Sequence, residues 1–212
     1  MSAIIQKLNE LSKLTFTLPI SNKSVTINKI NLELQSKFEK FATSTDNELQ
    51  ASVDYLEFIN RHIRKEIDGD VEFLDKLYIL LQWHNDIKDE KIDHAFTPVT
   101  IENLELSING APFVFEFELP SLVKDLAFLK FVSQKKADIK SIDILFYFTC
   151  RFLKTVQIDG DKLDVSDIPL TQTLFQHLDI NKVTSINKHI DQALEGIKTI
   201  RDLEVDARVF FA

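Results

Sequence analysis

The chain has 212 residues, enough for one large domain or two smaller lobes. Its 44% hydrophobic and 27% charged residues are typical of a folded protein, and its net charge of -8 argues against a nucleic-acid-binding protein, which normally carries a basic surplus. The only glycines are widely separated, at Gly69, Gly110, Gly160 and Gly196. Phosphate-binding loops, dinucleotide-binding turns and nucleophile elbows need closely spaced glycines, so the sequence excludes these enzyme motifs.

The first part of the sequence predicts a helix, a β-hairpin and three more helices. Apolar residues at helical spacing indicate a short helix over Ile4, Ile5, Leu8 and Leu11. Alternating residues on either side of a turn at 19–24 indicate the hairpin, and helical spacing returns over 32–42. Thr45 and Glu48 form a capping-box pattern ahead of a long helix, whose inward residues are Leu49, Val53, Leu56, Ile59, Ile63 and Ile67. The next apolar stripe contains Phe73, Leu74, Leu77, Leu80, Leu81 and His84.

The rest of the chain predicts two more hairpins, each followed by helices. Residues 100–108 and 113–119 alternate around Asn109-Gly110, a dipeptide that tolerates the positive φ of tight turns. Pro120-Ser121 marks the start of a helix over 122–131, and another is expected over 142–153. Asp159-Gly160 is the expected turn of the third hairpin, which precedes helices over 170–178 and 180–200. Residues 203–212 alternate and predict a terminal strand.

These elements predict a helix-rich α+β fold in which three β-hairpins are each followed by helices. The pattern restarts near residue 97. We therefore expect two loosely repeated lobes: 1–96, with the N-terminal hairpin and its helices, and 97–212, with the remaining hairpins, helices and terminal strand. A single continuous domain is the alternative.

The cysteine content and the N-terminus predict the compartment. One cysteine excludes an intrachain disulfide and fits a reducing environment. Cys150 lies in the apolar stretch 144–153, where a free thiol packs as a small hydrophobic side chain; a catalytic nucleophile is the second alternative. The N-terminus interleaves polar residues, unlike a secretory signal, and no stretch reaches the roughly 18 apolar residues of a membrane span. We expect a soluble intracellular protein.

No pattern in the sequence predicts a catalytic, cofactor or metal site. The histidines do not stand at metal-ligand spacing; they are His62, His84, His94, His177 and His189. Residues 159–164 carry acidic residues at two positions of a calcium loop, but they lack its later Gly and Glu, so a hairpin turn is preferred. Glu116 and Glu118 are expected on the exposed face of a strand whose other face carries phenylalanines. We expect no enzyme activity, no cofactor and no metal.

The C-terminal residues are the predicted partner-binding site. Most of the 17 phenylalanines stand at strand or helix spacing and are expected in the core. Chain ends are seldom buried unless they dock on something, and a terminal strand can add to this protein's own sheet or to a partner's. The predicted partner-binding residues are Val205, Val209, Phe210 and Phe211.

Four segments together resemble one protein family. They are the hairpin 18–27 with the helix containing Gln35, the junction 117–122, the hairpin 156–160 and the terminal segment 205–211. In this combination the chain resembles the baseplate hub assembly proteins of T-even-type tailed phages over nearly its whole length. The family pattern contains no defined active residues, so none transfers to this sequence.

The resemblance implies a non-enzymatic role in assembly of the contractile-tail baseplate hub. The implied protein is an assembly chaperone that binds a hub or tape-measure subunit in the host cytoplasm, with neither nucleic acid nor a membrane as partner and with its oligomeric state open. The acidic charge would keep such a protein soluble and complement a basic partner surface. A permanent structural subunit of the virion baseplate is the first alternative, and an enzyme with an unrecognised site is the second.

Overall fold

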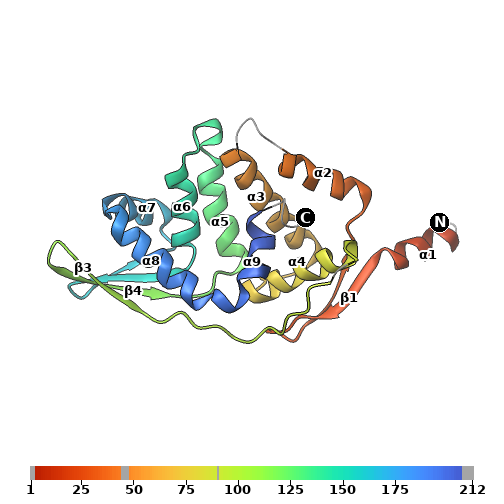
Figure 1. Cartoon of the computed structure of the whole chain (residues 1–212), viewed down its shortest axis with the longest axis horizontal. Coiled ribbons are helices and arrows are strands. Elements are labelled where there is room, and N and C mark those ends of the chain that lie inside the picture. Colours follow the sequence, from red (N-terminus) through yellow and green to blue (C-terminus); the bar gives the residue numbers. More distant parts are fainter. Residues whose placement is uncertain (1–2, 44–47, 90, 207–212) are drawn as a thin grey trace. The chain divides into compact units, whose positions relative to one another are not determined.

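The helices and strands fall into two compact units (Figure 1). A computed structural model describes residues 3–43, 48–89 and 91–206. The first unit, here called the N/C unit, joins the chain up to Pro98 to the chain from Thr199 onward, and the second, here called the central unit, spans Val99–Lys198. The central unit is therefore inserted, in sequence, into the N/C unit.

The N/C unit packs helices beside a two-stranded antiparallel sheet. Its helices are α1 (Ala3–Leu11), α2 (Leu32–Thr43), α3 (Glu48–Glu66), α4 (Phe73–Ile87) and α9 (Lys198–Val205), and its strands are β1 (Lys13–Thr17) and β2 (Ser24–Asn28). The stripes predicted for α3 and α4 are buried from Val53 to Ile63 and from Phe73 to His84. Phe38 of α2 meets Tyr55 and Phe58 of α3 edge to face, with ring centroids 5.8 and 5.3 Å apart. These contacts form an aromatic core.

The central unit packs helices against a four-stranded antiparallel sheet in the order β3-β4-β5-β6. Its strands are β3 (Leu104–Ile108), β4 (Ala111–Phe117), β5 (Leu153–Ile158) and β6 (Asp161–Asp164). Its helices are α5 (Leu122–Ser133), α6 (Ser141–Cys150), α7 (Ile168–His177) and α8 (Ile180–Ala193), with short 3-10 turns at Lys136–Asp138 and Glu195–Ile197. Phe146 of α6 meets Phe128 and Phe175 at centroid distances of 5.7 and 5.5 Å.

Local sequence explains the turns and helix starts of the central unit. Asn109 and Gly110 join β3 to β4 with φ values of 53° and 87°, the left-handed conformation that suits a two-residue hairpin turn. Ser121 caps α5 by accepting a hydrogen bond from the Lys124 N–H at 3.3 Å. Asp167 caps α7 in the same way through the Leu170 N–H at 3.1 Å, and Pro169 follows in the first turn of the helix.

The predicted helix-rich α+β class is confirmed, but the predicted terminal strand is wrong where it begins. Residues 203–205 are the last residues of α9, and Ile200, Leu203 and Glu204 are buried together at helical spacing. The rest of that strand lies outside the described residues, as does Thr45 of the predicted capping box. The repeat of two lobes stays a prediction; residues 199–206 belong to the N/C unit, not to the second half of the chain.

Candidate protein-interaction surface

The turn of the β1–β2 hairpin is fixed to α4 by one buried carboxylate. Asp75, in the first turn of α4, is only 1% exposed. Its two oxygens accept hydrogen bonds from the backbone N–H groups of Ile20 and Ser21 at 2.9 and 3.0 Å. A buried carboxylate needs such donors, and each bond to a charged group is stronger than a neutral one. If the turn moved away from α4, the buried Asp75 carboxylate would lose both of these backbone hydrogen bonds.

The open end of the hairpin is held by α3 and α4 together. The Glu66 carboxylate accepts hydrogen bonds from the backbone N–H and the side-chain amide of Asn28, each at 3.0 Å. The Trp83 indole N–H donates to the Asn28 carbonyl at 2.9 Å. Lys29 adds an ion pair with Asp86 at 2.7 Å. Both ends of the hairpin are thus anchored on helices.

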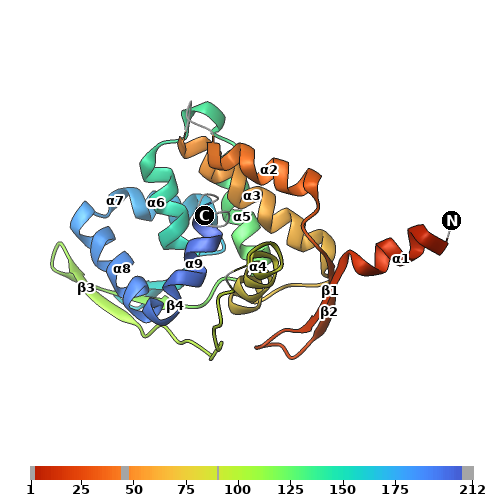
Figure 2. The ribbon, with the colours of Figure 1, turned by 45° about the vertical axis from the view of Figure 1, so that its right-hand side comes forward.

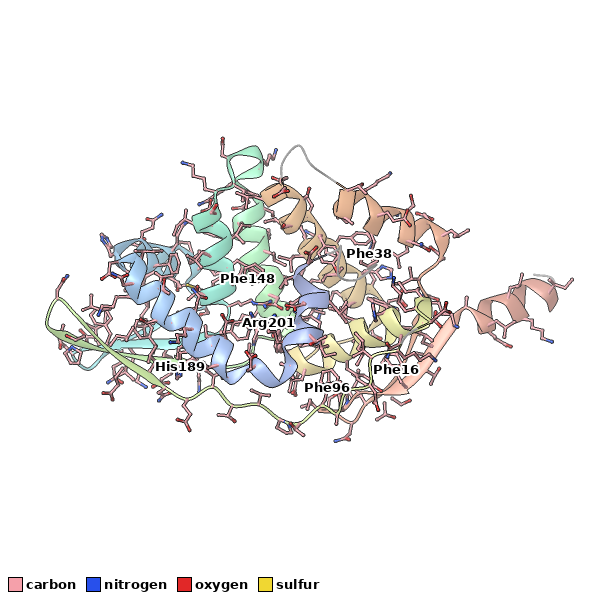
Figure 3. The ribbon with its side chains drawn as sticks, viewed as in Figure 1. Phe16, Phe38, Phe96, Phe148, His189 and Arg201 are labelled. Carbon is pink, nitrogen blue, oxygen red and sulfur yellow. The ribbon has the colours of Figure 1, made fainter. Side chains whose placement is uncertain are left out.

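Aromatic rings fill the space between these two anchors. Phe16 of β1 meets Tyr78 of α4 edge to face at 5.5 Å, and Tyr78 meets Phe96 at 5.4 Å. Phe16 and Phe96 are labelled in Figure 3. Leu14 and Phe16 are half-buried, whereas the alternate residues of β1 are exposed. The hairpin is therefore a rigid part of the N/C unit.

The outer edge of β1 has no hydrogen-bond partner within the described residues. The Lys29 N–H donates to the Ser12 carbonyl, and the Leu18 N–H donates to the Lys23 carbonyl. Bonded positions alternate along an antiparallel pair, so the backbone groups of Leu14 and Phe16 face β2. Those of Lys13, Thr15 and Thr17 face away from β2. Asn28, which is opposite Lys13, follows the same alternation. Its backbone N–H and carbonyl face away from β1 and bond to Glu66 and Trp83.

Helix α1 carries an uncovered apolar stripe at the N-terminal end of β1. Ile4, Leu8 and Leu11 are 73%, 59% and 66% exposed, and their spacing puts them on one face of the helix. In two views turned by 45°, α1 continues beyond β1 and stands apart from the other helices of the N/C unit (Figures 1 and 2). We call α1 and the β1–β2 hairpin together the N-terminal arm. It combines an uncovered apolar helix face with a free strand edge.

The predicted C-terminal site is only partly described by the structure. Val205 is the half-buried last residue of α9, while Val209, Phe210 and Phe211 lie outside the described residues. Helix α9 is fixed by a fully buried ion pair between Lys76 Nζ of α4 and Glu204 Oε1 at 2.5 Å. The Tyr55 hydroxyl also donates to the Leu203 carbonyl at 2.7 Å. The structure therefore places Val205 at the end of a docked helix.

Burial controls the protonation of Tyr55 at this junction. Desolvation, assisted by the Glu204 and Asp206 carboxylates, raises the pKa of Tyr55 well above its ordinary value of 10.0. The Tyr55 hydroxyl therefore stays protonated and donates its hydrogen bond to the Leu203 carbonyl of α9. The role of this group is structural.

A buried polar cluster of the central unit surrounds Arg151. Its guanidinium lies 4.9 and 4.8 Å from the ring centroids of Tyr147 and Phe152. Arg151 Nη1 donates to the Tyr147 hydroxyl at 2.9 Å and lies 3.3 Å from Asp125 Oδ1. Arg151 and Asp125 are both fully buried, so this cluster belongs to the interior of the unit and is closed to a substrate.

Cys150 has the environment of a core residue. It is buried, and desolvation raises the pKa of its thiol far above the ordinary range. The pocket beside it, lined by apolar side chains such as Phe115, Leu153 and Phe175, has room for about one water molecule. The prediction that Cys150 packs as a small hydrophobic residue is confirmed.

The described part of the chain lacks two features, a metal-binding cluster and a membrane-spanning helix. There, no three His, Cys, Asp or Glu side chains gather in a way that would hold a metal ion. None of its helices combines the length and the hydrophobicity needed to cross a bilayer. His189 Nε2 contacts the Glu102 carbonyl at 2.7 Å, and its ring packs on Phe117 (Figure 3), so this histidine ties α8 to neighbouring segments of the central unit.

Comparisons with known proteins found no match for the chain. No protein-family model matches the chain, and no curated protein and no solved structure is significantly similar to it.

The sequence indicated the apolar stripe of α1 but not its exposure. It also predicted the hairpin without showing which edge would be free. The anchors Asp75 and Glu66 were missed, since each contacts residues at least 38 positions away in the sequence. The alternation of Leu14 and Phe16 was the only available indication of which residues of β1 face inward.

Proposed function

We propose that the protein is a non-enzymatic assembly factor for the contractile-tail baseplate hub of a T-even-type phage. It acts as a chaperone that binds a hub or tape-measure subunit in the host cytoplasm during assembly. The observation that supports this proposal is the uncovered apolar stripe of α1, presented by a hairpin that is anchored at both ends. The resemblance described above supplies the class of partner.

The stripe suits binding in an apolar groove of another protein. An amphipathic helix inserts residues at i, i+4 and i+7 into such a groove, which is the spacing of Ile4, Leu8 and Leu11. A nine-residue helix is marginal by itself, so contact with a partner also stabilises its fold. The anchored hairpin lowers the entropic cost of binding, because it restricts the orientation of α1 before the partner arrives.

Capture experiments with stripe variants test the proposal. The tagged full chain is co-expressed with each hub and tape-measure protein of the phage and then purified. We expect one of these proteins to co-purify with the native chain and to be lost with Ile4→Ser, Leu8→Ser and Leu11→Ser combined. Leu32→Ser is the matched control, because Leu32 is 85% exposed but lies on α2, outside the stripe. Equal capture by the stripe and control variants contradicts the proposed surface.

Mass spectrometry separates a chaperone from a permanent subunit. We expect the protein in lysates of infected cells and its depletion from purified particles. Stoichiometric retention in finished particles contradicts the chaperone role.

A further inference from the structure

We propose that the chain forms a two-fold homodimer in which the free edge of β1 pairs antiparallel with β1 of a second copy. This goes beyond the proposed function, because it assigns a self-association surface separate from the apolar stripe of α1. The result would be one four-stranded sheet in the order β2-β1-β1-β2.

The backbone pattern of β1 is complementary to itself. Pairing centred on Thr15 sets Thr15 opposite Thr15, and Lys13 opposite Thr17 of the second copy. All three residues direct their N–H and C=O groups outward, so each facing pair can exchange two backbone hydrogen bonds. A shift by one residue would set outward groups against residues already bonded to β2, so shifts by an odd number of residues are excluded.

The side chains are compatible with the same register. Lys13, Thr15 and Thr17 all lie on the exposed face of the hairpin. Thr–Thr pairs across antiparallel strands are favourable, while like charges directly opposite each other are not. The two Lys13 residues would be four strand positions apart, about 13 Å at 3.3 Å per residue, so they would not oppose each other.

Among residues 3–43, 48–89 and 91–206, nothing gives the outer edge of β1 the usual protection of a free strand edge. Free edges are commonly protected by proline, a bulge, several charges or a covering segment. β1 pairs with β2 without a register shift, contains no proline, and carries a single charged residue, Lys13, at its end. The hydrogen bonds of the hairpin to Asp75 of α4 and Glu66 of α3 fix its position in the monomer. A second copy of β1 supplies the required extended strand without a like charge opposite Lys13.

The dimer would present two α1 helices. Since α1 continues from the N-terminal end of β1, antiparallel pairing places the two helices at opposite ends of the joined sheet (Figure 1). Because the dimer would carry two identical apolar stripes, it would bind bivalently to a partner with repeated sites.

Sedimentation of the full chain tests the dimer. We expect the native chain to reach twice its 24.5 kDa mass as its concentration rises to about 0.1 mM. Among backbone groups, Thr15→Pro removes only an outward N–H, and its ring blocks the edge, so it should raise the dissociation constant at least about tenfold. Thr15→Val keeps that N–H while losing the same hydroxyl contact with Thr26, and it should dimerise like the native chain. A monomeric native chain, or unchanged dimerisation of Thr15→Pro, overturns the proposal.

Charge variants test the register even where the proline variant fails to fold. Thr17→Lys sets a lysine opposite Lys13 of the second copy at both symmetry-related positions, so dimerisation should weaken about tenfold at low salt. Thr17→Glu sets a carboxylate there and should strengthen it. Equal dissociation constants for the two variants overturn the antiparallel register.

Amide hydrogen exchange supplies a residue-specific measurement. The N–H groups of Lys13, Thr15 and Thr17 should become protected as the protein concentration rises. Those of Leu14 and Phe16, already directed to β2, should be protected at all concentrations and serve as an internal control. Outward amides that exchange equally fast at every concentration contradict the pairing.

Discussion

The two terminal helices described here, α1 and α9, differ in what covers them. Each is short and amphipathic, with nine residues in α1 and eight in α9. The apolar residues of α1 are largely exposed, whereas Ile200 and Leu203 of α9 are buried. Helix α9 also carries Glu204, which pairs with Lys76, and a carbonyl that accepts the Tyr55 hydroxyl. Similar amphipathic patterns thus lead to a docked helix at one end and an uncovered one at the other.

Buried polar contacts explain why α9 is docked in one position and α1 is not. A buried ion pair contributes little net stability when intact, but removal of one partner leaves an uncompensated charge. Helix α9 is therefore held in one position on α4. Helix α1 is joined to β1 and, among the contacts described, has no such partner, so its apolar face stays available to another protein.

The largest expected effect comes from breaking the ion pair of α9. Lys76→Met leaves Glu204 buried without its cation and should reduce the free energy of unfolding by about 3–5 kcal/mol. Urea titration followed by fluorescence of Trp83, the single tryptophan, reports on the N/C unit. The double variant Lys76→Met with Glu204→Leu should recover much of the loss. A loss that the second substitution does not reduce argues against a specific pair.

A matched pair of leucines compares the two helices directly. Leu203→Ala should cost about 2–5 kcal/mol, because it leaves a cavity around a side chain that is 1% exposed. Leu8→Ala, on an exposed helix face, should change the free energy of unfolding by less than about 0.5 kcal/mol. Both values come from the same urea titration. Similar losses for the two variants would mean that α1 is covered in solution.

A smaller effect is expected from the Tyr55 hydroxyl. Tyr55→Phe leaves the Leu203 carbonyl without its donor and should cost about 1–2 kcal/mol. Tyr78→Phe is the control, since that half-buried ring contributes edge-to-face contacts that phenylalanine preserves. Its expected change is within about 0.5 kcal/mol. Thermal unfolding of both variants provides the measurement. Equal losses of unfolding free energy for the two variants would contradict the role of the Tyr55 hydroxyl.

The smallest effect concerns pH and the anchor of the arm. Burial lowers the pKa of His62 from its ordinary 6.5, although the nearby Glu66 carboxylate opposes this shift and Lys65 and Lys37 assist it. The folded state therefore binds this proton less readily than the unfolded state. The contribution of His62 is fully present above pH 6.5 and is lost as the pH falls through the lowered folded-state pKa.

His62→Gln tests this assignment. The variant should show a shallower loss of stability than the native chain as the pH falls below 6.5, measured by urea titrations at successive pH values. His84→Gln, on α4, is the matched comparison variant. Identical pH profiles for the native chain and the His62 variant contradict the assignment.

Local patterns in the sequence predicted most elements but not what covers them. The stripe from Val53 to Ile63 predicted α3, and Asn109-Gly110 predicted a tight turn, because both depend on neighbouring residues. Leu203 and Val205 fit a strand as well as a helix over so short a segment. The choice of helix depends on Lys76, which lies 128 residues from Glu204 in the sequence.

By itself, the sequence determined the helix-rich α+β class, the absence of closely spaced glycines and the apolar face of α1. These follow from composition and periodicity, which act within a few residues. Only the tertiary structure decided that α9 is docked, that the hairpin is anchored through Asp75 and Glu66, and that no described residue pairs with the outer edge of β1. The physical reason is that periodicity defines which face of an element is apolar, whereas burial and hydrogen bonding depend on distant residues brought together by folding.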